Sequence, residues 1–166
     1  MKKLSVNGVK WLKIIHIFFM VLMLGGIITS LTLRFSLNST DFDEVLVGYR
    51  LLQIVSDHII RYGAQGLLFS GVVYSVWTNW GWFKYRWVAV KWAVFFLQTI
   101  FGIFFIDRWM VDNLVMLEAE QAMALSNPVF VQNQNLMQYG ALVQVVVVVA
   151  LIGVSVLKPW KKKNER

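Results

Sequence analysis

The sequence predicts an all-α integral membrane protein, a single domain over residues 1–166 built as a bundle of four transmembrane helices. Hydrophobic residues make up 58% of the chain and charged residues only 15%, which is more apolar than ordinary soluble domains. A chain this short could not bury so much apolar surface in water. Four stretches reach the length of about 20 mostly apolar residues that a spanning helix needs. These are residues 11–33, 59–78, 88–106 and 137–157.

The distribution of charge predicts the orientation. If the first span starts inside and the spans alternate, 12 of the 16 basic residues and one of the nine acidic residues fall on the inner side. This is the positive-inside pattern, which places both chain ends in the cytoplasm (N-in/C-in). Topology and contact with anionic lipids explain the net charge of +7, so nucleic-acid binding is not needed to explain it. We expect a multi-pass protein of the bacterial cytoplasmic (inner) membrane.

Local signals predict the connections between the spans. The first span ends near Arg34, and Asp41 or Asp43 could cap the next helix. The short turn over residues 78–86 makes the second and third spans antiparallel neighbours. Residues 112–125 are rich in helix formers and are followed by Ser-Asn-Pro, which predicts a short amphipathic helix on the outer surface. The length of the first span favours a retained helix over a cleaved signal peptide.

Ionisable side chains at membrane depth are costly and therefore mark candidate functional positions. His16 in the first span and Lys91 in the third fall in one layer near the inner face, because both spans run from inside to outside. His58, with Asp57 and Arg61, lies at the outer end of the second span, about 25 Å away at the rise of an α-helix. One haem iron therefore could not bind both histidines, and the role of the outer cluster stays open.

The two inner residues have structural as well as functional interpretations. His16 could simply hydrogen-bond a neighbouring helix, and Lys91 could extend to the lipid headgroups. No carboxylate lies in the inner half of any span. An anionic ligand such as a haem propionate would therefore suit Lys91. The chain has no cysteine, which excludes thiolate metal sites and iron–sulfur clusters.

Helical spacing places Met20 and Met23 on the face of His16, and Gln98 on the face of Lys91. Together with neighbouring aromatic residues, these faces would suit a flat hydrophobic macrocycle. The two methionines could instead bind copper together with His16, because soft thioether ligands select Cu(I). They could also be ordinary packing residues.

Two stretches carry a family resemblance, "KWLKIIHIFFMVLMLGGIITSLTLRF" (residues 10–35) and "RWVAVKW" (residues 86–92). The W-x-K-x-x-H start of the first and the W-x-x-x-K start of the second resemble the four-helix membrane protoporphyrinogen oxidases. They also resemble the broader set of small membrane proteins related to copper-resistance protein D, and here an uncharacterised member of that set. The resemblance implies haem b, with His16 and Lys91 as the key residues.

We therefore predict a haem-b-binding inner-membrane protein that works in electron transfer or tetrapyrrole handling. The candidate cofactor-binding residues are His16, Lys91, Met20, Met23 and Gln98, and the candidate metal ligands are His16 and Lys91. Activity as a membrane oxidoreductase stays open, and a two-electron oxidation would need a quinone or another membrane redox partner. The alternatives are a cofactor-free accessory or assembly protein and a copper-handling protein. The oligomeric state, a homo-oligomer included, stays open.

Overall fold

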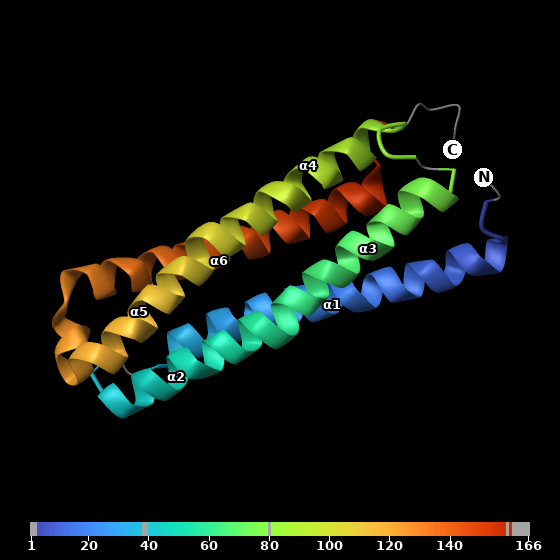
Figure 1. Ribbon diagram of the computed structural model, residues 1–166. Coiled ribbons are helices and arrows are strands. Elements are labelled where there is room, and N and C mark those ends of the chain that lie inside the picture. Colours follow the sequence, from blue (N-terminus) through green and yellow to red (C-terminus); the bar gives the residue numbers. More distant parts are fainter. Residues whose placement is uncertain (1–2, 38–39, 80, 159, 161–166) are drawn as a thin grey trace.

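The protein is a bundle of helices in a computed structural model that describes residues 3–37, 40–79, 81–158 and 160 (Figure 1). No strand occurs in these residues, so the all-α prediction is confirmed. Segments η1 and η2 are π-helical and η3 is a 3₁₀-helix. The elements in chain order are α1 (Val6–Ser36), α2 (Phe42–Val55), η1 (Ser56–Ile60), α3 (Arg61–Trp77), α4 (Arg86–Phe101), η2 (Gly102–Ile106), α5 (Asp107–Glu120), η3 (Gln121–Ser126) and α6 (Pro128–Leu157).

The helical backbone is continuous from α2 through η1 into α3, and from α4 through η2 into α5. The elements therefore form four rods, which are α1, α2–α3, α4–α5 and α6 (Figure 1). The first rod packs along α3 and α6, while α5 packs against α2 and α6. The start of α1 lies at the same end of the bundle as the ends of α3 and α6 (Figure 1). There the backbone N–H of Leu4 donates to the Trp77 carbonyl at 3.0 Å.

Three helical stretches are long and apolar enough to cross a membrane: Val6–Ser36, Arg86–Ser126 and Pro128–Leu157. Their outward faces carry large exposed apolar side chains, such as Phe18 on α1 and Leu97 on α4. Extended apolar surface of this kind is unusual on a protein in water. The helices are thus compatible with contact with a lipid bilayer.

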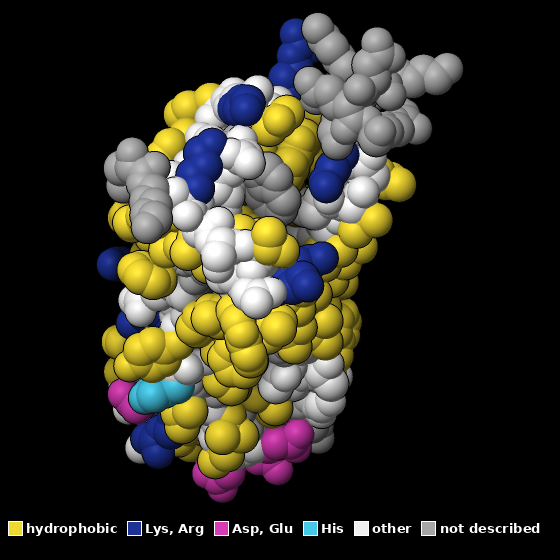
Figure 2. All heavy atoms as spheres, turned by 90° about the vertical axis from the view of Figure 1, so that its right-hand side faces the viewer, with side chains coloured by type: hydrophobic (Ala, Val, Ile, Leu, Met, Phe, Trp, Pro, Cys, Tyr) yellow, Lys and Arg dark blue, Asp and Glu magenta, His cyan; other side chains and the backbone are white. Residues whose placement is uncertain are grey.

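The two ends of the bundle differ in charge. We call the end at which α1 begins the basic end; its charged residues include Lys10, Lys13, Lys84, Arg86 and Lys158. We call the end at which α2 begins the acidic end; its charged residues include Asp41, Asp43, Glu44, Glu118 and Glu120. Figure 2 shows Lys and Arg side chains gathered toward the top, Asp and Glu side chains at the bottom and an apolar region between them. The structure therefore separates the charges along the bundle as the sequence predicts.

At the acidic end, the start of α2 agrees with the prediction and the helix predicted over residues 112–125 does not. Asp41 caps α2 by accepting a hydrogen bond from the Glu44 backbone N–H at 3.2 Å. The outer helix predicted over residues 112–125 is not a separate helix. Instead, α5 continues the rod of α4 and ends at Glu120, just before Gln121, whose φ is 52°. The glycine at 102 begins the π-helical segment η2 instead of breaking the rod. Pro128 opens α6, since the missing N–H of proline costs nothing at the first helical position.

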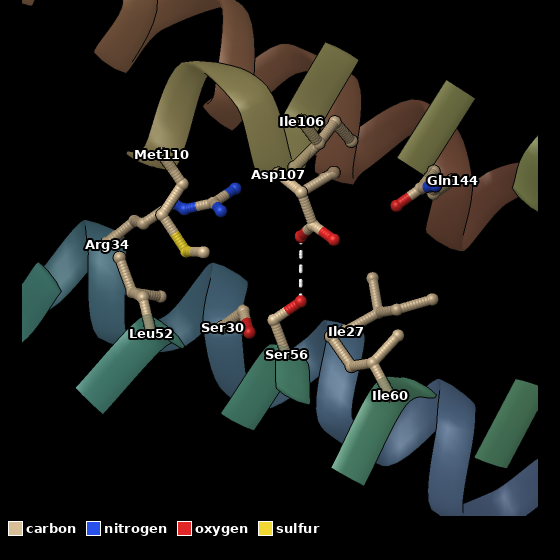
Figure 3. Close-up of a pocket in the computed structure, with 11 residues that line it drawn as sticks. Ile27, Ser30, Arg34, Leu52, Ser56, Ile60, Ile106, Asp107, Met110 and Gln144 are labelled. Carbon is tan, nitrogen blue, oxygen red and sulfur yellow. Dashed lines mark hydrogen bonds between the residues drawn. The ribbon is translucent and has the colours of Figure 1, made fainter. Parts of the chain in front are cut away.

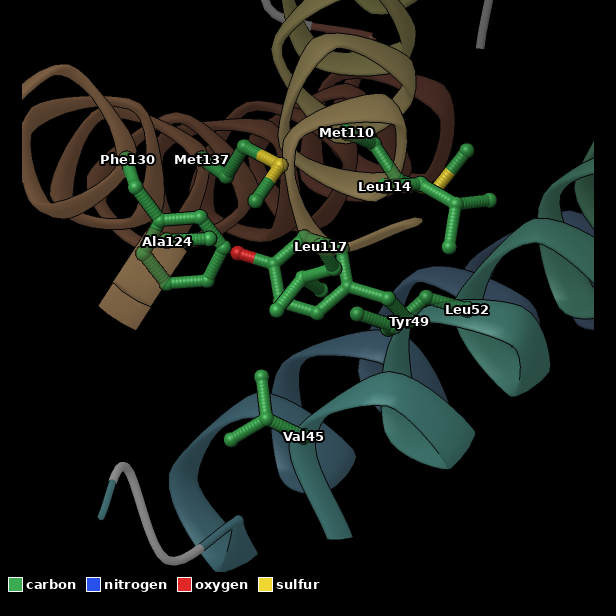
Figure 4. Packing of buried hydrophobic residues seen from close by; sticks show 9 residues of the cluster. All are labelled: Val45, Tyr49, Leu52, Met110, Leu114, Leu117, Ala124, Phe130 and Met137. Carbon is green, nitrogen blue, oxygen red and sulfur yellow. The ribbon is translucent and has the colours of Figure 1, made fainter. Parts of the chain in front are cut away.

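The acidic end holds a packed core, built from α2, α5, η3 and α6 (Figure 4). Its members are Val45, Tyr49, Leu52, Met110, Leu114, Leu117, Ala124, Phe130 and Met137. The buried Asn113 amide donates to the Tyr49 hydroxyl at 2.9 Å and to the Phe130 carbonyl at 3.0 Å, and its oxygen accepts from Asn133 at 2.9 Å. Burial raises the pKa of Tyr49 to about 12. This network joins α2, α5 and α6 beyond the most apolar part of the bundle.

Candidate functional site

His16 lies at the interface of α1 and α3, toward the basic end. Its Nδ1 is 2.7 Å from the hydroxyl oxygen of Ser70. The Tyr74 ring meets the imidazole edge-on, with the ring centroids 5.5 Å apart. Ser70 is buried and His16 is half-buried. Two side chains of one helix therefore fix the position of an imidazole that another helix supplies.

The hydroxyl of Ser70 determines which imidazole nitrogen carries the proton. That hydroxyl donates within its own helix, 2.7 Å from the Gly66 carbonyl and 3.1 Å from the Leu67 carbonyl. We assign its single proton to these carbonyls, so that its oxygen accepts from Nδ1–H of His16. The other nitrogen, Nε2, then carries the lone pair. Within the described residues Nε2 has no hydrogen-bond partner.

Lys91 lies in the second turn of α4, which begins at the basic end. The Lys91 Nζ lies 5.4 Å from the centroid of the Trp87 ring, and the Lys158 Nζ lies 5.5 Å from it. Two ammonium groups thus share one buried aromatic ring. Among the described residues, no carboxylate forms a salt bridge with Lys91.

The remaining predicted ligand residues take part in helix packing. Met20 and Met23 are half-buried on α1. The Gln98 side chain donates to the Gln144 main-chain carbonyl at 3.1 Å, and the Gln144 side chain returns a bond to the Gln98 carbonyl at 3.3 Å. These reciprocal bonds join α4 to α6. Roles for Met20, Met23 and Gln98 toward a cofactor stay predictions.

Two glycines bring α1 and α3 into close contact beside His16. A Cβ at Gly63 would lie 2.6 Å from the backbone nitrogen of Met23. A Cβ at Gly66 would lie 2.2 Å from the ring of Phe19. Both distances are far below van der Waals contact, so only glycine permits this approach. The interface between α1 and α3 has no room for a macrocycle at these positions.

His58 is remote from His16. It lies 12 residues before Ser70 on the same rod, or about 18 Å at the rise of a helix. The His58 side chain is exposed and its Nδ1–H donates to the Ile54 carbonyl at 3.2 Å. The neighbouring Arg61 pairs with Asp57 at 2.9 Å. The two histidines therefore cannot share one ligand.

A second polar site lies between η1 and η2, where sequence reasoning did not expect one (Figure 3). It surrounds a cavity of about 30 Å³ that all four rods line. Asp107, directly after η2, accepts a 2.7 Å hydrogen bond from Ser56, the first residue of η1. It also pairs with Arg61 at 3.7 Å. Arg34 and Asp107 directly follow the predicted spans 11–33 and 88–106, but both side chains line this cavity.

Arg34 contributes a donor without a partner. Its guanidinium donates to the Met137 carbonyl at 2.9 Å, while its buried Nε has no partner in the described part of the chain. An unsatisfied buried donor costs about 1–3 kcal/mol. One signal for this site was present in the sequence: Arg34 lies inside the last turn of α1, whose apolar pattern continues to Phe35.

The described residues contain no group of three or more His, Asp or Glu side chains that could hold a metal ion.

Fold and surface define the chain as a helical protein with three helices able to cross a membrane. No family model, no curated protein and no solved structure matches it.

Proposed function

We propose that the chain is a four-span protein of the bacterial inner membrane, with the basic end in the cytoplasm. The α2–η1–α3 rod runs from Phe42 to Trp77, which at about 1.5 Å per residue exceeds the thickness of a bilayer. It packs along α1 and runs antiparallel to it, so it would cross the bilayer together with α1. The basic end then meets the cytoplasmic leaflet, as the positive-inside rule requires.

Labelling of single cysteines tests this orientation, because the chain has none of its own. Met123→Cys places a thiol in η3 at the acidic end, at a side chain that is 74% exposed. Lys84→Cys places one in the turn between α3 and α4. A membrane-impermeant maleimide should label Met123→Cys in intact cells and Lys84→Cys only after permeabilisation. The reverse pattern would contradict the orientation.

We further propose that the protein binds haem b at the basic end, where Nε2 of His16 would hold the iron. The observation that carries this proposal is the hydrogen bond from Nδ1 of His16 to Ser70. Imidazoles that bind metals commonly use the other ring nitrogen for such a bond, which fixes the tautomer and the ring orientation. Ser70 and Tyr74 would thus hold Nε2 of His16 in position before the iron binds.

The basic residues fit the anionic side of a haem. Lys91 and Lys158, which lie over the Trp87 ring, supply two ammonium groups for two propionates. Lys91 could instead bind the iron, which requires its neutral form. Because Gly63 and Gly66 close the interface of α1 and α3, a macrocycle would have to lie outside that part of the interface.

Haem, when bound, supplies one-electron chemistry. The residues of this chain would orient the group, hold its carboxylates and exclude water from it. The role would be electron transfer or tetrapyrrole handling, with a quinone or another membrane redox partner to deliver or accept electrons.

The visible spectrum of protein purified from haem-replete cells tests the proposal. We expect a Soret band and a b-type α band, which His16→Ala should abolish and His58→Ala should leave in place. Ser70→Ala should weaken or shift the bands, because the imidazole would lose its orientation. Lys91→Met separates iron ligation, which would change the spectrum, from a propionate contact, which would change haem retention. A colourless wild-type preparation would contradict the proposal and favour a cofactor-free accessory role; bound copper without a Soret band would favour copper handling.

A further inference from the structure

We infer that the cavity between η1 and η2 is a binding site for about two water molecules, which connect the side chains of Arg34 and Asp107. The volume of about 30 Å³ sets the size of the ligand, since one buried water needs roughly 10–15 Å³ of such space. The cavity lies at the level of η1, whereas His16 contacts Ser70 further along α3. The inference therefore does not depend on the haem proposal.

The polar groups around the cavity match the hydrogen bonds of water. The Nε–H of Arg34 is a buried donor without a protein partner in the described chain. Ser30 is only 5% exposed, and its hydroxyl-bearing side chain lines the cavity. The carboxylate of Asp107 faces the cavity, and the side-chain oxygen of Gln144 points toward Asp107 (Figure 3). Water can accept from the two donors and donate to the two acceptors, which no apolar ligand can do.

Charge favours a neutral ligand over an ion. A cation would meet the guanidinium of Arg34, and an anion would meet the carboxylate of Asp107. The next charges outward repeat this balance, because Arg61 pairs with Asp107 at 3.7 Å and with Asp57 at 2.9 Å. These two cationic and two anionic side chains leave no net charge for an ion to neutralise.

The backbone around the site is also unusual. Ser56 begins one π-helical segment and Asp107 follows the other, and their hydrogen bond joins the two segments across the cavity (Figure 3). Single π-helical turns within α-helices often mark functional sites, because they interrupt the regular hydrogen-bond ladder. Here they bring a serine hydroxyl and a carboxylate from different rods to one hydrated point.

Water-to-protein magnetisation transfer in solid-state NMR tests this site directly. The protein is labelled with ¹⁵N in arginine and asparagine and reconstituted in lipid vesicles, and the Arg34 Nε signal is identified by its loss in Arg34→Lys. We expect that signal to gain intensity from water several-fold faster than the side-chain amide of Asn113, which is buried but bonded to protein alone. A build-up for Arg34 as slow as that of Asn113 would overturn the inference.

A matched pair of variants locates the water. Ser30→Val fills the cavity and should slow the transfer to Arg34 to the rate of Asn113. Ser75→Val changes a buried serine that does not line the cavity and should leave the transfer unchanged. If Ser30→Val does not fold, the wild-type comparison with Asn113 still decides. A change in the chemical shift of Arg34 Nε when chloride is replaced by gluconate would overturn the inference and would favour a bound anion.

Discussion

The hydroxyl of Ser56 donates a 2.7 Å hydrogen bond to the carboxylate of Asp107 and so joins the two π-helical segments of the protein. Ser56 is buried, and its partner on the other rod is 51 positions away in the chain. A hydrogen bond to a charged acceptor is stronger than one between neutral groups. The contact therefore fixes the register of the α2–α3 rod against the α4–α5 rod.

Ser56→Ala should destabilise the protein by about 1.5–3 kcal/mol, the range for hydrogen bonds to charged groups. The measurement is reversible unfolding in mixed detergent micelles. The control is Ser36→Ala, whose hydroxyl donates only to the Thr32 carbonyl of its own helix at 2.9 Å and should change stability by about 0.5 kcal/mol or less. Equal effects of the two variants would contradict a special role for the bond between the rods.

Gly63→Ala should separate α1 from α3. Because its new methyl group would lie 2.6 Å from the backbone of Met23, the helices must move, at a cost of about 1–3 kcal/mol. Gly25→Ala is the matched control, since a Cβ there has no other atom within 4 Å. That variant should be neutral or slightly stabilising, because alanine favours the helix. The same unfolding assay distinguishes them, and a neutral Gly63→Ala would show that the interface adapts.

Substitutions in the amide network of the acidic end should lower the free energy of unfolding by different amounts. Asn113→Ala leaves the Tyr49 hydroxyl, the Phe130 carbonyl and the Asn133 amide without their partner, and should cost about 3 kcal/mol or more. Tyr49→Phe removes one acceptor but leaves the bond from Asn113 to Phe130 intact, and should cost about 1 kcal/mol. Unfolding free energies of both variants check the order. A larger loss for Tyr49→Phe than for Asn113→Ala would contradict the network.

Stability should fall at alkaline pH through Tyr49. Its pKa is raised by burial from 10.0 to about 12, so the unfolded chain loses this proton first. The stabilising contribution is therefore complete below pH 10 and is lost as the pH rises from there toward 12. Tyr49→Phe should show a shallower decline over this interval than the wild type. Parallel curves would contradict the assignment, and tyrosinate absorbance of the folded protein provides an independent titration.

The sequence predicted the helical architecture well because apolar length and charge placement are local properties. The level placement of His16 and Lys91 followed from the same reasoning and stays a prediction. The second polar site was not predicted. Arg34 and Asp107 fall just outside the predicted spans 11–33 and 88–106, and the continuation of the helices past these bounds depends on packing between rods. Gln98 was expected to face the same space as Lys91, and the structure shows it bonded to α6.

A helical turn that closes on the fifth residue instead of the fourth holds one residue more than its neighbours. In a rod built this way, the sequence before the insertion and the sequence after it are out of phase by about 100°. Removal of a single residue from Ser56–Ile60 would leave a regular helix of nearly the same composition. Because the wide turn already absorbs the extra residue, the two halves would keep the sides that they now turn to their neighbours. A single deletion within Ser56–Ile60 should therefore be less harmful than a single deletion within the regular helix α3, where every later side chain would rotate by about 100°.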